Sequence, residues 1–154
     1  MRITRSGEYG IRLAMRLAID GEQLTIHELS TLEGISEATV AKVISRLRRS
    51  GTVLAERGRH GGYSLALAPE DITVARILDA MDDHVYDSTF CDRMSPGLGA
   101  CAHLSTCTLR PVWRELEELT GSFLGGITVA DLIAGHHHGS GRQLPLATGR
   151  GDTA

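Results

Sequence analysis

The residues best suited to chemistry in this sequence are its three cysteines, Cys91, Cys101 and Cys107, which lie in one short stretch with Pro, Gly and Ser. Cysteine thiolates bind zinc and iron–sulfur clusters. A structural zinc site usually has two ligands about two to four residues apart, whereas nine residues separate the first pair of cysteines and five separate the second. These long intervals favour a ligand larger than a single ion.

A fourth ligand has to come from elsewhere, and the nearest candidates, Asp92 and His103, are residue types that more often lie on a plain surface. The simpler interpretation is that the cysteines are buried or incidental. However, three of them in a segment of Gly, Pro and Ser are hard to place in a core. Their odd number also argues against a disulfide framework.

The composition predicts a cytoplasmic protein with no membrane span. No apolar run approaches the roughly 20 residues that a membrane helix needs, and arginines spread through residues 1–18 are unlike a secretory signal. The net charge of −3 hides an asymmetry, because residues 1–66 have ten Lys and Arg against seven Asp and Glu (+3), and residues 67–154 have six against twelve (−6). The first part can therefore offer a positive face to nucleic acid.

Apolar periodicity predicts two helices ahead of a basic third one. The first begins after Ser6 and ends near Asp20. Thr25 and Glu28 have the spacing of a capping box, so a second, short helix should run to Gly34.

The third helix is predicted to begin at Ser36, acting as its cap, and to end before Gly51. Helical spacing gives it a buried side of Val40, Val43, Ile44 and Leu47, and an opposite side of Thr39, Lys42, Arg46 and Arg49. Residues 53–57 and 63–67 then read as a hairpin with a glycine-rich tip. Helix, turn, basic helix and hairpin are the order of a winged helix-turn-helix.

Downstream, residues 72–83 and 127–133 are each expected to form a threonine-capped helix. Between them, a helix that starts near Pro111 carries an apolar stripe of Val112, Trp113, Leu116, Leu119 and Phe123, which suits dimerisation. The predicted fold is therefore mainly α with a small β wing, namely a winged helix-turn-helix plus a long dimerisation helix. We expect a DNA-binding domain at 1–67, a cluster-binding loop with dimerisation helices at 68–135, and a disordered tail at 136–154.

Residues 42–60 contain six Lys and Arg and one Glu, a local charge of +5. A basic stripe alone is more often a solvated face, but here it lies beside a hairpin whose tip can approach a phosphate backbone. We therefore expect double-stranded DNA as the partner. The predicted contact residues are Ser36, Thr39, Lys42, Arg46, Arg49, Arg57, Arg59 and His60.

Over residues 1–135 the chain resembles the bacterial winged-helix iron–sulfur regulators of the IscR, NsrR and RirA family. The resemblance rests on the opening Met-Arg-Ile-Thr, the helix from Ile35-Ser36 to Leu47-Arg48, the last cysteine interval, Trp113-Arg114 before Ile127-Thr128, and the hairpin sequence 57–63. It implies a homodimer, usually a repressor, whose DNA affinity follows the state of a cluster held by Cys91, Cys101 and Cys107. It favours [4Fe-4S] over [2Fe-2S] and matches Arg59 to the family's wing arginine. The implied signal is nitric oxide, redox state or iron supply.

The chain departs from this family pattern at its fourth ligand and on its recognition helix. Arg110 stands where IscR-like members have a histidine ligand, and Glu8 stands where NsrR-like members have an aspartate ligand from the other subunit. Glu8 is therefore the preferred fourth ligand, across the dimer. Ala38 and Ala41 replace polar readers of IscR-like members, so the operator sequence does not transfer.

The alternatives belong to three other classes. A cluster-free thiol-redox or zinc-responsive regulator would keep the DNA-binding domain. A metalloenzyme would need a base paired with a nucleophile, and His103 has no evident orienting partner in the sequence, so we predict no enzyme. A protein-interaction module would use the amphipathic helix alone.

Overall fold

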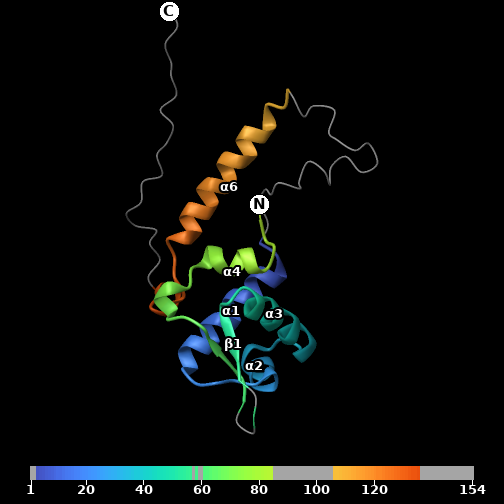
Figure 1. The fold of residues 1–154 in the computed structure, drawn as a ribbon, viewed down its shortest axis with the longest axis vertical. Coiled ribbons are helices and arrows are strands. Elements are labelled where there is room, and N and C mark those ends of the chain that lie inside the picture. The colour runs from blue at the N-terminus through green and yellow to red at the C-terminus, as the bar shows by residue number, and fades with distance from the viewer. Residues whose placement is uncertain (1–2, 57, 59–60, 85–105, 136–154) are drawn as a thin grey trace, which may run out of the picture.

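The computed structural model describes residues 3–56, 58, 61–84 and 106–135 (Figure 1). The cysteines Cys91 and Cys101, the wing-tip residues Arg57, Arg59 and His60, and the predicted disordered tail at 136–154 lie outside these ranges. The helices and strands follow the predicted order. They are α1 (Arg5–Asp20), α2 (Ile26–Glu33), α3 (Glu37–Arg49), β1 (Val53–Ala55), β2 (Tyr63–Leu65), the 3-10 turn η1 (Pro69–Asp71), α4 (Val74–Ala80), α6 (Leu109–Gly125) and α7 (Val129–Ile133).

Side-chain caps fix where the first two helices begin. The Thr4 hydroxyl accepts a hydrogen bond from the backbone N–H of Gly7 at the start of α1. The predicted capping box of α2 is confirmed, because the Thr25 hydroxyl accepts from the Glu28 backbone N–H while the Glu28 carboxylate accepts from the Thr25 backbone N–H. Both helices therefore begin at a residue that satisfies their otherwise unpaired amides.

The predicted cap at Ser36 is wrong in its chemistry. Ser36 occupies the N-cap position of α3, but its hydroxyl lies 2.9 Å from the Thr39 hydroxyl and bonds no backbone amide. The two hydroxyls satisfy each other instead. The first turn of α3 is held by the Ser36 carbonyl, which accepts from the N–H groups of Thr39 and Val40.

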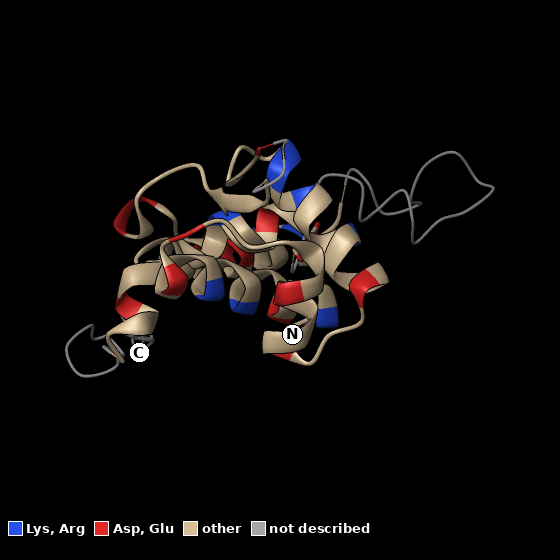
Figure 2. Cartoon of the chain, turned by 90° about the horizontal axis from the view of Figure 1, so that it is seen from below, with Lys and Arg blue, Asp and Glu red and all other residues tan. Residues whose placement is uncertain are grey.

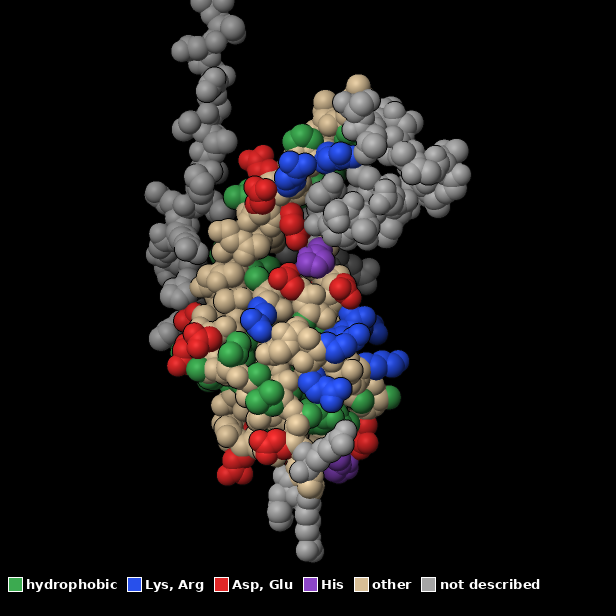
Figure 3. Space-filling model, viewed as in Figure 1, with side chains coloured by type: hydrophobic (Ala, Val, Ile, Leu, Met, Phe, Trp, Pro, Cys, Tyr) green, Lys and Arg blue, Asp and Glu red, His purple; other side chains and the backbone are tan. Residues whose placement is uncertain are grey.

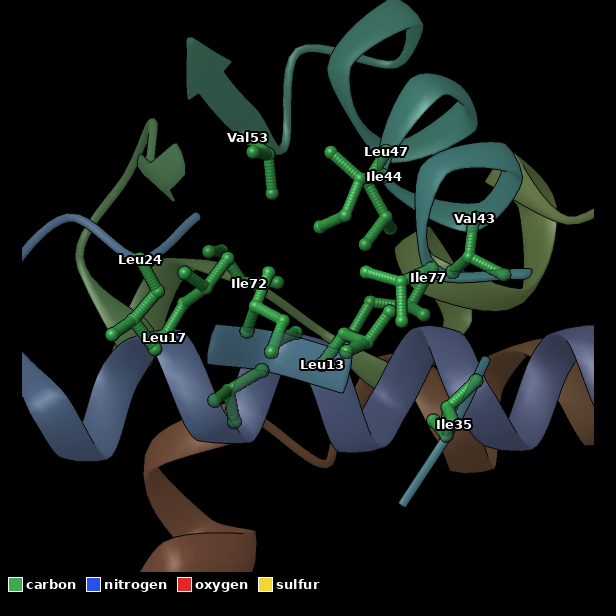
Figure 4. Packing of buried hydrophobic residues seen from close by; sticks show 14 of the residues in the cluster. Leu13, Leu17, Leu24, Ile35, Val43, Ile44, Leu47, Val53, Ile72 and Ile77 are labelled. Carbon is green, nitrogen blue, oxygen red and sulfur yellow. The ribbon is translucent and has the colours of Figure 1, made fainter. Parts of the chain in front are cut away.

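The predicted apolar side of α3 is confirmed. Val40, Val43, Ile44 and Leu47 are at most 3% exposed. Their side chains meet Leu13 and Leu17 of α1 and Ile72 and Ile77 from the segment after the hairpin (Figure 4). Because this side of α3 is packed, only its other side is available to a partner.

The hairpin is antiparallel and shorter than predicted, with Val53 opposite Leu65 and Ala55 opposite Tyr63. Tyr63 also forms an antiparallel bridge with Leu24, and it packs against the core. Gly62 permits this approach, since a Cβ there would lie 2.9 Å from the Leu24 carbonyl oxygen. The base of the wing is thereby fixed to the loop before α2.

The segment after the hairpin returns to the same core. Thr73 and Thr128, the N-caps of α4 and α7, form an antiparallel bridge in which Val74 donates to the Ile127 carbonyl and Val129 to the Ile72 carbonyl. Ile72, Ile77, Met81 and Val129 belong to one hydrophobic cluster with α1 and α3. The helix predicted for 72–83 is shorter, because α4 ends at Ala80 and Asp82 takes a positive φ of 56°.

The C-terminal end of the long helix α6 lies beside α4, and its N-terminal end extends away from the rest of the described chain (Figure 1). None of its residues is buried against the described residues. Its apolar stripe is open to solvent in the single chain, with Val112 52%, Leu119 46% and Phe123 46% exposed. No helix in the described ranges is long and apolar enough to cross a membrane.

Candidate nucleic-acid interface

The outer side of α3 carries a local concentration of positive charge. Lys42, Arg48 and Arg49 are exposed, as is Ser36 at the start of the helix, while Thr39 is half-buried. Lys and Arg side chains gather on the side of the molecule where α3 lies (Figure 3), whereas acidic residues lie among the basic ones over the other helices (Figure 2). A face of this kind can replace counterions on a phosphate backbone.

Arg46, predicted to belong to this face, instead lies against the end of α4. Its Nη1 donates to the Met81 carbonyl at 2.7 Å and lies 3.4 Å from the Asp82 carboxylate. The side chain is 39% exposed. The last carbonyls of a helix carry partial negative charge, which favours a cation at this place.

A second arginine makes the reciprocal contact. Arg76 of α4 donates from Nη2 to the Ser50 carbonyl at 3.0 Å and from Nε to the Thr52 hydroxyl at 3.3 Å. Ser50 is the C-cap of α3, and Thr52 is fully buried. Each helix therefore holds the C-terminal end of the other through an arginine, which fixes the orientation of α3.

The turn between α2 and α3 is held from α1. The Glu33 carboxylate, only 10% exposed, accepts from Nε of Arg16 at 2.8 Å and Nε of Arg12 at 3.1 Å. The hydrogen bond to Glu33 raises the pKa of Arg16 above its usual value. These arginines of α1 are thus occupied inside the domain and add little to its outer positive face.

Arg48 is a candidate contact that the predicted set omitted. It lies off the stripe formed by Lys42 and Arg49, but together with Thr25, Glu56 and Tyr63 it lines an open hollow of about 450 Å³ between α2 and the hairpin. Its place in the basic run of 42–60 is the only sequence signal that could have identified it. At the described part of the wing, Gly58 has a φ of 140° and its carbonyl accepts from the Gly61 N–H.

Of the proposed cluster ligands, the structure describes Cys107 and Glu8. Cys107 is half-buried, forms no disulfide among the described residues, and lies two positions before α6. Glu8 is exposed in the first turn of α1, and its carboxylate accepts no hydrogen bond from any residue in the described ranges. No group of three His, Cys, Asp or Glu within those ranges could hold a metal ion. A soft thiolate and an accessible carboxylate are donor types that suit iron.

The fold and the basic outer side of α3 define a winged helix-turn-helix protein. The chain belongs to the Rrf2 family, whose model, described as an iron-dependent transcriptional regulator, matches residues 3–135. It is thus a transcriptional regulator of that family.

Relatives and solved structures agree with this assignment. The HTH-type transcriptional regulator IscR of Salmonella paratyphi B is 32% identical over 162 residues, a match that covers all of this chain and 96% of the relative. IscR of Aliivibrio salmonicida is 31% identical over 135 residues, covering 86% and 77%. IscR of T. potens has the same fold with a TM-score of 0.67 at 23% identity, covering 93% of both chains. CymR of B. subtilis also gives 0.67 at 22% identity, covering 87% and 97%.

Proposed function

We propose that this chain is a cytoplasmic, homodimeric repressor that binds an operator in double-stranded DNA and responds to the state of an iron–sulfur cluster. The observation that carries the proposal is the exposed basic side of α3, whose opposite side is buried in the core. The chain also belongs to a family described as iron-dependent transcriptional regulators. The proposed signal is nitric oxide, redox state or iron supply. The proposed functional division places DNA binding in residues 1–67 and the cluster-binding loop and dimerisation helices in residues 68–135, although residues on both sides of position 67 share one hydrophobic core.

Binding would place the exposed side of α3 in the major groove. Lys42 and Arg49, with Arg57 and Arg59 of the wing, would neutralise phosphates, while Ser36 and Thr39 lie at the helix end that reaches base edges in such domains. His60 completes the proposed contacts at the wing tip. Each neutralised phosphate releases a counterion, so affinity should fall steeply with salt.

Dimerisation would bury the apolar stripe of α6. Trp113, Leu116 and Leu119 are each more than a third exposed in the single chain. Exposing a stripe of this length to water is unfavourable, and a second copy of the same helix offers a matching surface. The dimer would also bring one subunit's Glu8 towards the other subunit's cysteines.

The cluster would be held by Cys91, Cys101 and Cys107, with Glu8 of the opposite subunit as the fourth ligand. This donor set favours [4Fe-4S] over [2Fe-2S] through the resemblance to NsrR-like regulators. A bound cluster would supply a redox-active and nitric-oxide-reactive centre. The chain's own part is to hold the donors on α1 and before α6, so that ligand loss shifts the balance between conformers with different α3 spacing.

The cluster content and the DNA binding of the purified protein test the proposal. Protein isolated without oxygen should contain iron and sulfide and give a Mössbauer spectrum of a cluster, and it should select specific duplexes from a random pool. Arg59→Ala should weaken that binding with the cluster intact. A colourless protein without iron or sulfide, even after reconstitution, would favour the thiol-redox or zinc-responsive regulator. That alternative stays open because Arg110 stands where IscR-like members have a histidine ligand.

A further inference from the structure

We infer that Arg46 is a positioning residue, which holds α3 on the turn after α4, and that it is not a ligand of DNA phosphate. The inference rests on the proposed DNA binding and assigns the residue a different part in it. Sequence spacing places Arg46 with Lys42 and Arg49 on one helical stripe. In the structure, however, the Arg46 side chain is bound to the turn after α4, whereas those of Lys42 and Arg49 are exposed.

Among the described residues, the side-chain hydrogen bonds and ion pair of Arg46 are with residues 81–82. Nη1 donates to the Met81 carbonyl at 2.7 Å, which is a short charge-assisted hydrogen bond. The same atom lies 3.4 Å from the Asp82 carboxylate. These two contacts hold the guanidinium against the end of α4, whereas Lys42 and Arg49 are exposed and no hydrogen bond or ion pair with another described residue holds them.

The turn that receives Arg46 is itself fixed. The Met81 side chain is 3% exposed and belongs to the core, and the Asp83 N–H donates to the Leu78 carbonyl. Asp83 in turn accepts from the backbone and hydroxyl of Thr4, the cap of α1. Arg46 therefore ties the proposed recognition helix to a rigid point that also contacts the turn containing Glu8.

Arg46→Gln and Arg49→Gln form a matched pair for testing this role. Each variant of the full chain is titrated against a duplex that the wild type selects from a random pool, over a series of salt concentrations. Loss of a phosphate contact lowers the slope of log affinity against log salt by about one per contact. We expect Arg49→Gln to lower the slope, and Arg46→Gln to weaken binding about tenfold with the wild-type slope retained.

The outcomes separate the two levels of the proposal. A reduced slope for Arg46→Gln, or unchanged affinity and slope, would overturn the positioning role while leaving DNA binding in place. A wild-type chain that selects no duplex would overturn DNA binding itself and the inference with it.

A second variant removes the dependence on Arg46→Gln folding. Asp82→Asn tolerates the positive φ of this position and weakens the hold on Arg46. If Arg46 positions α3, Asp82→Asn binds DNA about twofold more weakly, and adding it to Arg46→Gln has no further effect. If Arg46 binds phosphate, releasing it from Asp82 makes binding tighter, and that result would overturn the inference.

Discussion

The Asp83 carboxylate accepts two hydrogen bonds from Thr4, one from the backbone N–H at 2.8 Å and one from the hydroxyl at 2.9 Å. Thr4 is the N-cap of α1, and Asp83 lies in the turn after α4. The contact therefore fixes the first turn of α1, which contains Glu8, to the turn that also receives Arg46. A negative charge at this place is also favoured by the dipole of α1.

Asp83→Asn should loosen this connection. The amide presents a single neutral acceptor and no charge to the end of α1, so we expect the free energy of unfolding to fall by about 1 kcal/mol. Denaturant unfolding followed by circular dichroism measures it. Asp71→Asn, an exposed acid in η1, is the control and should leave the midpoint unchanged. An equal effect of the two variants would contradict a specific role for the Asp83 contact.

Gly7→Ala tests the same contact from the helix side. A Cβ at Gly7 would lie 2.3 Å from Oδ2 of Asp83 and 2.8 Å from Cδ2 of Leu78, so one of them has to move. We expect a loss of about 1–3 kcal/mol in unfolding free energy. At Gly121 in α6 nothing lies within 4 Å of the added atom, and Gly121→Ala should stabilise the helix by up to about 1 kcal/mol. Equal unfolding midpoints for the two variants would rule out the predicted clash.

Leu119→Glu tests the stripe on α6. Leu119 is 46% exposed in the single chain, so the domain should fold normally, while a carboxylate in the proposed dimer interface should weaken association about 100-fold or more. Sedimentation over a concentration series reports the change. Leu32→Glu is the control, because Leu32 is similarly exposed at 47% but lies on α2. A dimer that tolerates Leu119→Glu as well as Leu32→Glu would show that α6 is not the interface.

The capping box of α2 predicts an acid-dependent part of the stability. Hydrogen bonds from the Thr25 backbone N–H and hydroxyl lower the pKa of Glu28 from its usual value of 4.5. The contribution is therefore present above that pH and is lost as the pH falls through the lowered folded-state pKa. The difference in unfolding midpoint between wild type and Glu28→Gln should thus be constant near neutrality and disappear in acid. The exposed Glu22, substituted in the same way, should show no such difference.

Local patterns predicted the parts of this fold that depend on local interactions. The spacing of Val40, Val43, Ile44 and Leu47 was sufficient to identify the buried side of α3, because one helical face packs on one core. The Thr25 and Glu28 capping box was likewise readable, since both partners lie within one turn. Ser36 shows the limit of such patterns, because its hydroxyl pairs with the Thr39 hydroxyl and does not accept from a backbone N–H.

The role of Arg46 could not be read from the sequence. Its partner carbonyl at Met81 lies 35 positions away, and helical spacing alone cannot distinguish an arginine that faces DNA from one that reaches the end of another helix. Because α4 ends at Ala80, earlier than predicted, and Asp82 takes a left-handed conformation, the Met81 carbonyl is free to accept from Arg46. The contact thus depends on tertiary structure, as does the one between Asp83 and Thr4.

Glu8→Ala tests the proposed ligand that lies farthest from the cysteines in sequence. Glu8 is exposed and follows a fixed cap, so its removal should leave the fold intact. If its carboxylate completes the cluster in the partner subunit, the variant should lose its cluster absorption in air faster than the wild type. The DNA affinity of the cluster-free protein should not change. Glu22→Ala, which removes an exposed carboxylate after the end of α1, should retain the wild-type lifetime. Cys107→Ser should be more severe and prevent loading altogether, because a thiolate binds iron far more strongly than a hydroxyl. An unchanged spectrum and lifetime for Glu8→Ala, alongside loss of iron from Cys107→Ser, would retain the cluster but assign its fourth ligand elsewhere.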